Sequence, residues 1–184
     1  MKDYVADAKE RMTHAVEATV RDFQTIRTGR ASPAMLDRIE VDAYGSAMPI
    51  NQLANISVPE PRQLLIQPYD KSMTQAIEKA IQKSDLGINP IVDGNGIRLT
   101  IQQMTEDRRK ELVKQVHGRA EEGRVAIRNV RRDAIDHLKK AEKAKEMSED
   151  ELKRHEVEVQ KLTDKYVAEV DDHQKKKDVE LMEV

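Results

Sequence analysis

Three long segments of the chain, 1–28, 105–145 and 149–178, carry apolar side chains at alternating steps of three and four residues. This spacing places the apolar groups on one narrow stripe of an α-helix, the seam along which nearly parallel helices pack. The pattern predicts a three-helix bundle, elongated because its middle helix would approach about 60 Å. The seam positions are Val5, Ala8, Met12, Ala15, Thr19, Phe23 and Ile26; Val113, Val116, Ala120, Gly123, Ile127, Val130, Ala134, Leu138 and Ala141; and Leu152, His155, Val159, Leu162, Tyr166 and Val170.

Helix-end signals accompany two of these segments. The string "SEDE" predicts that Ser148 caps the third helix and that Glu151 completes a capping box. Gly29 predicts the end of the first helix, because glycine readily adopts the conformation that follows a helix.

All six prolines lie between residues 33 and 90, and proline disrupts helix interiors. This distribution predicts a discontinuous helical domain, 1–30 with 104–184, into which a different domain, 31–103, is inserted. Two chain connections at one place favour a hinge, near 30–33 and 102–105. The expected hinge residues are Arg30, Ala31, Ser32, Gln102, Gln103 and Met104.

The inserted segment shows shorter patterns that predict a small β/α/β unit. Alternation in 36–45 predicts a strand leading into a turn at Gly45, and 53–58 and 63–69 predict two more strands. A helix is expected from its cap at Ser72 to a stop at Gly87. The remaining stretch predicts a hairpin that turns at Asp93–Gly96.

Composition limits the function classes. Aromatic residues are only 3% and charged residues 36%, which suits long solvated helices, and cysteine is absent, which excludes disulfides and thiolate sites. Apolar runs typical of a signal peptide or a membrane span are missing, so we expect a cytoplasmic protein. The five histidines form no metal-ligand pattern and "DGNG" suits a hairpin turn, so we expect no metal or cofactor and not an enzyme.

The near-neutral total charge conceals a strong asymmetry. Segment 104–145 has thirteen basic and eight acidic side chains, whereas 146–184 has seven basic and thirteen acidic ones. In the middle helix, five cations share an arc of about 100° beside the apolar stripe: Arg124, Arg128, Arg131, Arg132 and Lys139.

This arginine stripe has two interpretations. Arginine is suited to bidentate contact with phosphate, so the stripe fits the backbone of a folded RNA, without aromatic residues for base stacking. Alternatively, the acidic third helix neutralises these arginines by inter-helix ion pairs. A second basic set, Arg27, Arg30, Arg108 and Arg109, is expected where the first helix ends and the second begins.

Several long strings identify a family resemblance over nearly the whole chain. "IRTGRASPAML" (26–36), "VDAYGSAMPINQLANISVPEPRQLLIQPYD" (41–70), "SDLGINPIVDGNGIRL" (84–99), "TEDRRKELVK" (105–114) and "VAIRNVRRDAIDHLKK" (125–140) resemble the bacterial ribosome recycling factors.

The resemblance implies an L-shaped α+β protein with the dimensions of a transfer RNA, in which a three-helix bundle carries a hinged small domain. It implies a monomer that binds the post-termination ribosome at 23S rRNA of the 50S subunit. With elongation factor G and its GTP hydrolysis, the factor would separate the subunits. The implied RNA-binding residues are Arg128, Arg131 and Arg132, with Arg27, Arg30 and Arg109 on the same surface; the charge pattern adds Arg124.

One departure concerns the second hinge connection, where the family usually has prolines and this chain has Thr100, Gln102 and Gln103. Loss of proline releases the restriction on φ, so we expect a looser or differently angled hinge. Two other function classes remain open from the residues alone. One is a coiled-coil adaptor that binds a protein partner, and the other is an enzyme hosted by the small domain.

Overall fold

The computed structural model describes residues 3–183, and the chain divides into two compact units. The helical unit comprises the chain up to Arg27 together with Glu106–Glu183, and the small unit is Thr28–Thr105. The range expected from the prolines, 31–103, falls just inside this small unit.

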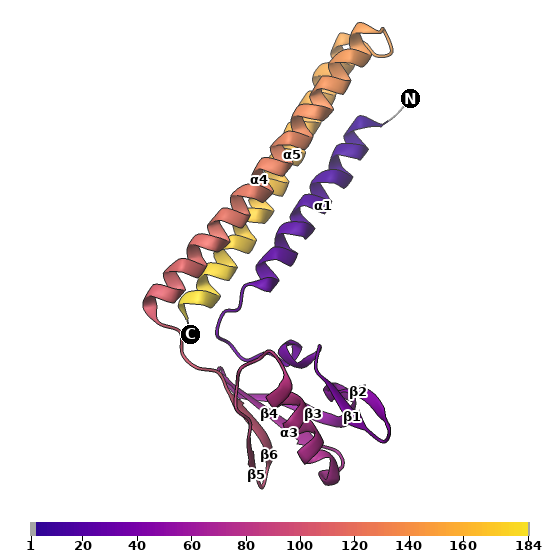
Figure 1. Cartoon of the computed structure of the whole chain (residues 1–184). Coiled ribbons are helices and arrows are strands. Elements are labelled where there is room, and N and C mark those ends of the chain that lie inside the picture. Colours follow the sequence, from indigo (N-terminus) through magenta and orange to yellow (C-terminus); the bar gives the residue numbers. More distant parts are fainter. Residues whose placement is uncertain (1–2, 184) are drawn as a thin grey trace. The chain divides into compact units, whose positions relative to one another are not determined.

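The helical unit is a three-helix bundle, as predicted. Its helices are α1 (Tyr4–Thr25), α4 (Glu106–Lys143) and α5 (Glu149–Met182), and each packs against the other two (Figure 1). The buried side chains of α4 are Leu112, Val116, Ala120, Gly123, Ile127, Val130, Ala134, Leu138 and Ala141. The bundle core is therefore built mainly from small and aliphatic groups, as the scarcity of aromatic residues requires.

The seam is wider than one narrow stripe per helix. Val16 and Thr163 are buried although the pattern did not single them out, and Leu112 is buried where Val113 was expected. His155 and Leu162, predicted seam residues of α5, are only half-buried. The reason is that each helix faces two neighbours, so its buried face extends around the helix beyond a single line of contact.

A close approach between α1 and α4 occurs at Gly123. A Cβ atom on this glycine would collide with the Thr19 side chain, whose hydroxyl donates a hydrogen bond of 2.9 Å to the Ala15 carbonyl. Thr19 is itself 4% exposed. Glycine in mid-helix is intrinsically unfavourable, so its presence here is explained by the space it leaves for Thr19.

The helix ends confirm one signal and correct another. Ser148 caps α5 and Glu151 closes the capping box. The stop predicted at Gly29 is wrong: α1 ends at Thr25, with Ile26 as C-cap. Gly29 instead adopts a positive φ of 79° in the connection that follows. Arg27 and Arg30 therefore lie beyond α1 and do not complement the dipole of its last turn.

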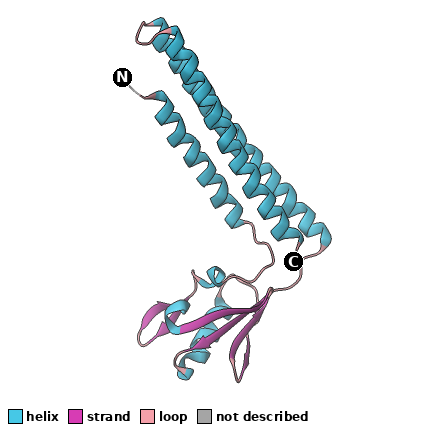
Figure 2. Cartoon of the chain, turned by 180° about the vertical axis from the view of Figure 1, so that it is seen from behind, coloured by secondary structure: helices cyan, strands magenta, loops and turns pink. Residues whose placement is uncertain are grey.

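The small unit contains two antiparallel sheets. One pairs β1 (Glu40–Ala43) with β2 (Ser46–Pro49). The other has the order β3-β4-β6-β5, formed by Ala54–Glu60, Gln63–Pro68, Gly96–Thr100 and Ile91–Asp93. Helix α3 (Thr74–Lys83) packs against one side of the strands, and Figure 2 shows the opposite sheet face without a helix over it. Short helical segments complete the unit: η1 (Pro33–Leu36), α2 (Ile50–Leu53) and η2 (Lys71–Met73).

The small unit has its own apolar core. It includes Val41, Ile50, Leu64, Ile66, Ile77 and Leu99, each with an exposed fraction of 0%. Residues from both sheets and from α2 and α3 contribute, so one core joins all these elements.

Several boundaries in the small unit differ from the sequence prediction. Leu36 belongs to η1 and not to a strand, and β2 and α2 were not predicted. Ser72 does not cap α3; it lies in η2, and the Asp70 carboxylate accepts a hydrogen bond from its backbone. Helix α3 ends at Lys83, before the predicted stop at Gly87. The predicted hairpin is confirmed, since Asp93 pairs with Gly96 at its turn.

We predict that Gly123→Ala destabilises the bundle whereas Gly118→Ala stabilises it. A Cβ atom at Gly118 meets open space, so the substitution gains about 1 kcal/mol of helix propensity. At Gly123 the same gain is outweighed by overpacking against Thr19, which costs about 1–3 kcal/mol. Urea unfolding of the two variants measures the difference. Adding Thr19→Ala should restore the stability of Gly123→Ala, and equal stabilities of the two single variants would contradict the close-packing explanation.

We predict that the capping box makes α5 sensitive to acid. The backbone N–H of Ser148 donates a 2.8 Å hydrogen bond to the Glu151 carboxylate, and this bond, followed by one from the Ser148 side chain, lowers the Glu151 pKa below 4.5. A lowered folded-state pKa adds stability above pH 4.5 that is lost as the pH falls through the folded pKa. Glu151→Ala should therefore lower the melting temperature at pH 7, and the difference from wild type should narrow in acid.

Ser148→Ala provides the matched control for this titration. It removes the capping hydroxyl, at a cost of about 1 kcal/mol, but leaves the backbone donor to Glu151 in place. Its destabilisation should therefore depend on pH less than that of Glu151→Ala, because it removes only the second of the two hydrogen bonds that lower the Glu151 pKa. A pH-independent effect of Glu151→Ala, followed by circular dichroism, would show that the carboxylate does not stabilise the helix by its charge.

Candidate nucleic-acid interface

The rotation of α4 about its axis is determined by its buried residues. Ile127 has an exposed fraction of 0% and Val130 of 6%, and both face the other helices of the bundle. At 100° per residue, Arg132 lies about 140° from Ile127 and about 160° from Val130 around the helix. The side chain of Arg132 therefore projects nearly opposite to the seam.

Arg124 lies inside a network that joins α4 to α5. Its side chain is only 17% exposed, and its guanidinium contacts Glu121 Oε2 at 2.9 Å and Asp171 Oδ1 at 2.7 Å. It also donates a 3.1 Å hydrogen bond to Gln174. Burial opposes ionisation of the guanidinium, but the hydrogen bonds to Glu121 and Asp171 outweigh it, and the pKa of Arg124 is raised. Arg124 thus makes the inter-helix ion pair of the alternative interpretation.

Arg128 is more exposed and shares its acidic partner with Arg124. Its side chain is 43% exposed, and its Nη1 lies 3.3 Å from Glu121 Oε1. The hydrogen bond from Arg124, with the charges of both arginines, lowers the pKa of Glu121. Glu121 therefore pairs with two guanidinium groups, while Asp171 pairs with Arg124 as well, so the four side chains together carry no net charge.

Arg131 has a neutral partner on α5. Its Nη1 donates a 3.2 Å hydrogen bond to the Gln160 side chain, and Gln160 in turn donates to Asp164 at 2.9 Å. The Nε atom of Arg131 is buried and has no hydrogen-bond partner within residues 3–183. The charge of this half-buried guanidinium is thus held in place without a direct ion pair in the described part of the chain.

Arg132 and Lys139 are the exposed cations at the outer side of the stripe. Neither forms an ion pair or a hydrogen bond with another residue of the described range 3–183. They lie seven residues apart, two helical turns, on the same side of α4. These two side chains can contact an anion without first breaking an internal bond.

The second basic set is divided by the fold. Arg27 is exposed in the helical unit, while Arg30 is exposed in the small unit. In the first turn of α4, Arg108 contacts Glu111 at 2.9 Å. Arg109 is half-buried, and its buried Nε has no hydrogen-bond partner among the described residues.

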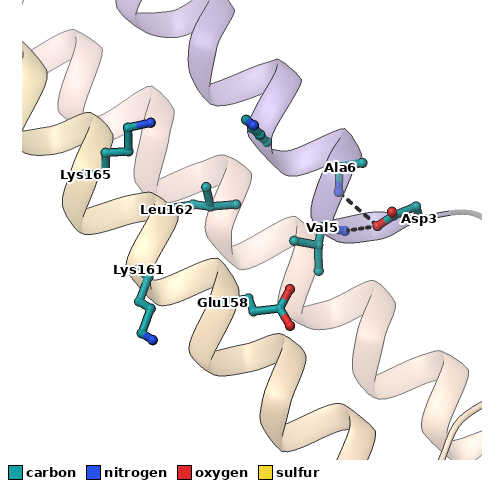
Figure 3. A pocket seen from close by; sticks show the side chains of 8 residues that line it. Asp3, Val5, Ala6, Glu158, Lys161, Leu162 and Lys165 are labelled. Carbon is teal, nitrogen blue, oxygen red and sulfur yellow. Dashed lines mark hydrogen bonds between the residues drawn. The ribbon is translucent and has the colours of Figure 1, made fainter.

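A separate groove of about 430 Å³ runs between α1 and α5 (Figure 3). Its apolar lining is Val5, Ala6 and Leu162, and the Asp3 carboxylate at its edge accepts hydrogen bonds from the backbone of Val5 and Ala6. The remaining lining residues are Lys9, Glu158, Lys161 and Lys165. Because only α1 and α5 line it, the groove is distinct from the arginine stripe of α4.

Residues 3–183 contain neither a metal-ligand cluster nor a membrane-spanning helix. This range holds no group of three or more His, Cys, Asp or Glu side chains placed to bind a metal ion. It also contains no helix with the length and apolar character needed to cross a membrane.

The partners of the arginines were the part of the site that sequence reasoning missed. Asp171 and Gln174 lie 47 and 50 positions from Arg124, and Gln160 lies 29 from Arg131. The acidic surplus of the third helix was a signal for such pairing, but the register between α4 and α5 decides which arginine finds a partner.

Comparisons with known proteins agree with the resemblance. The family model described as ribosome recycling factor matches residues 19–182. A ribosome-recycling factor of Symbiobacterium thermophilum is 56% identical over 183 residues, covering 100% of this chain and 99% of its own length. A solution structure of the ribosome recycling factor has a TM-score of 0.71 and 42% identity, with 100% of both chains covered.

A second solved structure is similar at a TM-score of 0.63 and 45% identity, covering 98% of both chains. It is described as models for the T. thermophilus ribosome recycling factor and the E. coli elongation factor G bound to the E. coli post-termination complex. The agreement extends over the whole chain in sequence, in the helical bundle and in the small sheet unit. The chain belongs to the ribosome recycling factor family.

Proposed function

We propose that this protein recycles ribosomes in the cytoplasm. It binds the post-termination ribosome as a monomer and, together with elongation factor G and GTP hydrolysis by that factor, separates the subunits. It is a binding protein and not an enzyme. Family membership supports this proposal, as does the similar structure of a recycling factor with elongation factor G on a post-termination complex.

We propose further that α4 contacts 23S rRNA of the 50S subunit. The observation that carries this proposal is the exposed Arg132, which has no partner within residues 3–183 and projects nearly opposite to the buried seam. Arg128 and Arg131 extend the contact, since one shares its carboxylate and the other has only a neutral partner. Lys139 adds a second positive charge on the same side, also without a partner among the residues that the structure describes.

The remaining predicted arginines receive different roles. Arg124 orients the stripe from within the α4–α5 network and contributes little direct contact, because its side chain is only 17% exposed. We propose that Arg27 and Arg109 of the helical unit and Arg30 of the small unit also contact RNA, as the family resemblance implies.

We propose that the connections between the units act as a hinge. The segment 101–105 has no regular structure, and Ile101 at its start is held by a 2.8 Å hydrogen bond to the Arg62 carbonyl. The hinge residues are Arg30, Ala31 and Ser32 in one connection and Gln102, Gln103 and Met104 in the other. Glutamine leaves φ unrestricted where relatives of this family usually have proline.

We predict that Arg132→Glu weakens binding to purified 50S subunits without lowering the melting temperature. The substitution reverses a charge that has no partner within residues 3–183. A lost phosphate contact should weaken binding by about tenfold and reduce the salt dependence of the affinity. Sedimentation over a salt series, with and without elongation factor G, measures both effects.

Arg124→Gln is the matched control for this measurement. It should lower the melting temperature, because it breaks the ion pairs to Glu121 and Asp171. The dependence of the 50S affinity on salt concentration should change little. Undiminished 50S binding by Arg132→Glu would refute the assignment. Absence of ribosome binding by the wild-type protein, with salt-insensitive capture of a protein partner, would instead favour a coiled-coil adaptor.

We predict that Gln102→Pro narrows the range of inter-unit arrangements, because proline restricts φ at the connection. The chain has no cysteine, so Lys79→Cys in α3 and Lys175→Cys in α5 allow specific dye attachment at exposed positions. Single-molecule energy transfer should give a narrower distribution for Gln102→Pro than for the control Gln102→Ala. Identical widths would argue against a hinge governed by this residue.

A further inference from the structure

The most exposed part of the small unit's first sheet is the tip of the β1–β2 hairpin. Ala43 pairs with Ser46, so Tyr44 and Gly45 form a two-residue turn. Both have positive φ, 52° and 83° respectively. Such turns favour Asn, Asp or Gly, and a tyrosine in this conformation is unfavourable. The turn conformation therefore gives no reason for an aromatic side chain at this position.

The Tyr44 side chain is nevertheless held in one place. It is 70% exposed, and its hydroxyl donates a 2.7 Å hydrogen bond to Asp70 Oδ2. The other oxygen of Asp70 accepts from the backbone and the hydroxyl of Ser72, at 3.0 and 2.7 Å. The bond to Asp70 restrains the ring at the surface, so that less side-chain entropy is lost on binding.

The chemistry around the ring is acidic. Residues of β1 alternate between buried and exposed, so Glu40 and Asp42 share the exposed face of the strand, which leads to Tyr44. Neither carboxylate has an ion pair or a hydrogen bond within residues 3–183. The hydrogen bonds from Ser72, then from Tyr44, lower the pKa of Asp70, which stays ionised at neutral pH. Lys71 and Arg38 are the nearest cations in sequence.

We propose that the acidic face formed by Glu40, Asp42 and Tyr44 of the β1–β2 hairpin, together with Asp70, docks a basic protein segment. Arginine suits it best, because a guanidinium stacks on the ring of Tyr44 while pairing with a neighbouring carboxylate. RNA does not fit, because three carboxylates repel a phosphate backbone. The protein then presents a cationic face on α4 and, in a different unit, an acidic aromatic face, suited to partners of opposite charge.

Titration of the full-length protein with an octa-arginine peptide, followed residue by residue in amide NMR spectra, tests the proposal. The residue-specific readout is needed because α5 is also acidic. Shifts are expected at the amides of residues 40–46 and 70–72. Tyr44→Asn removes the ring but suits the turn, so its melting temperature should equal or exceed that of wild type. The affinity at this face should fall about three- to tenfold.

Two further variants distinguish the contribution of the Tyr44 ring to peptide binding from that of its hydroxyl and from that of any exposed apolar side chain. Tyr44→Phe keeps the ring and should retain most of the affinity. Ile91→Asn removes another apolar side chain, which is 62% exposed on β5. This strand lies at the far side of the small unit from the hairpin (Figure 1). The substitution should therefore leave the peptide affinity of the hairpin face unchanged. Absence of shifts at residues 40–44, equal affinity of Tyr44→Asn, or stronger shifts there with an RNA oligonucleotide would each overturn the proposal.

A photoreactive p-benzoylphenylalanine in place of Tyr44 extends the test to the ribosome. Cross-linking to an arginine- or lysine-rich protein segment supports the docking face, and cross-linking to RNA alone overturns it. This arm rests on the proposed function. If the wild-type protein does not sediment with ribosomes, the proposed function fails while the peptide titration still decides the docking face.

Discussion

The packing of α4 against both α1 and α5 is the constraint on which the rest of the helical unit depends. Ile127 and Val130 are buried in the seam, and Gly123 lies so close to Thr19 that a side chain has no room there. A helix held at several such points cannot rotate about its axis. Its outward residues are therefore determined as firmly as its buried ones, and Arg132 faces away from the core for this reason.

Proximity to the acidic helix α5 then divides the arginines of α4 into different kinds. Arg124 lies at the edge facing α5 and is neutralised by Asp171. Arg131 meets only the amide of Gln160. Arg132, further around the helix, has no partner within residues 3–183. The same stripe thus combines a structural ion pair with exposed charge, which explains how a chain with net charge −2 presents a basic surface.

The small unit follows a different principle. Its core is closed by β-branched and aliphatic residues of two sheets and of α2 and α3, independently of the bundle seam. Its outer surface is acidic near the β1–β2 turn, where Tyr44 adopts a conformation that a turn-forming residue would adopt more easily. Local unfavourable geometry beside a well-packed core is typical of positions that serve binding.

The sequence by itself determined the elements whose signals are local and periodic: the three long helices, the capping box of Ser148 and Glu151, and the hairpin at Asp93–Gly96. Five strings between residues 26 and 140 also indicated the family. Predicted boundaries were wrong where local hydrogen bonds compete. Ser72, for example, belongs to η2, because its backbone N–H donates a hydrogen bond to Asp70. Only the tertiary structure decided which arginine is paired and which is exposed. The reason is that the register between α4 and α5 arises from side-chain packing between segments far apart in the chain, which periodicity within one helix does not contain.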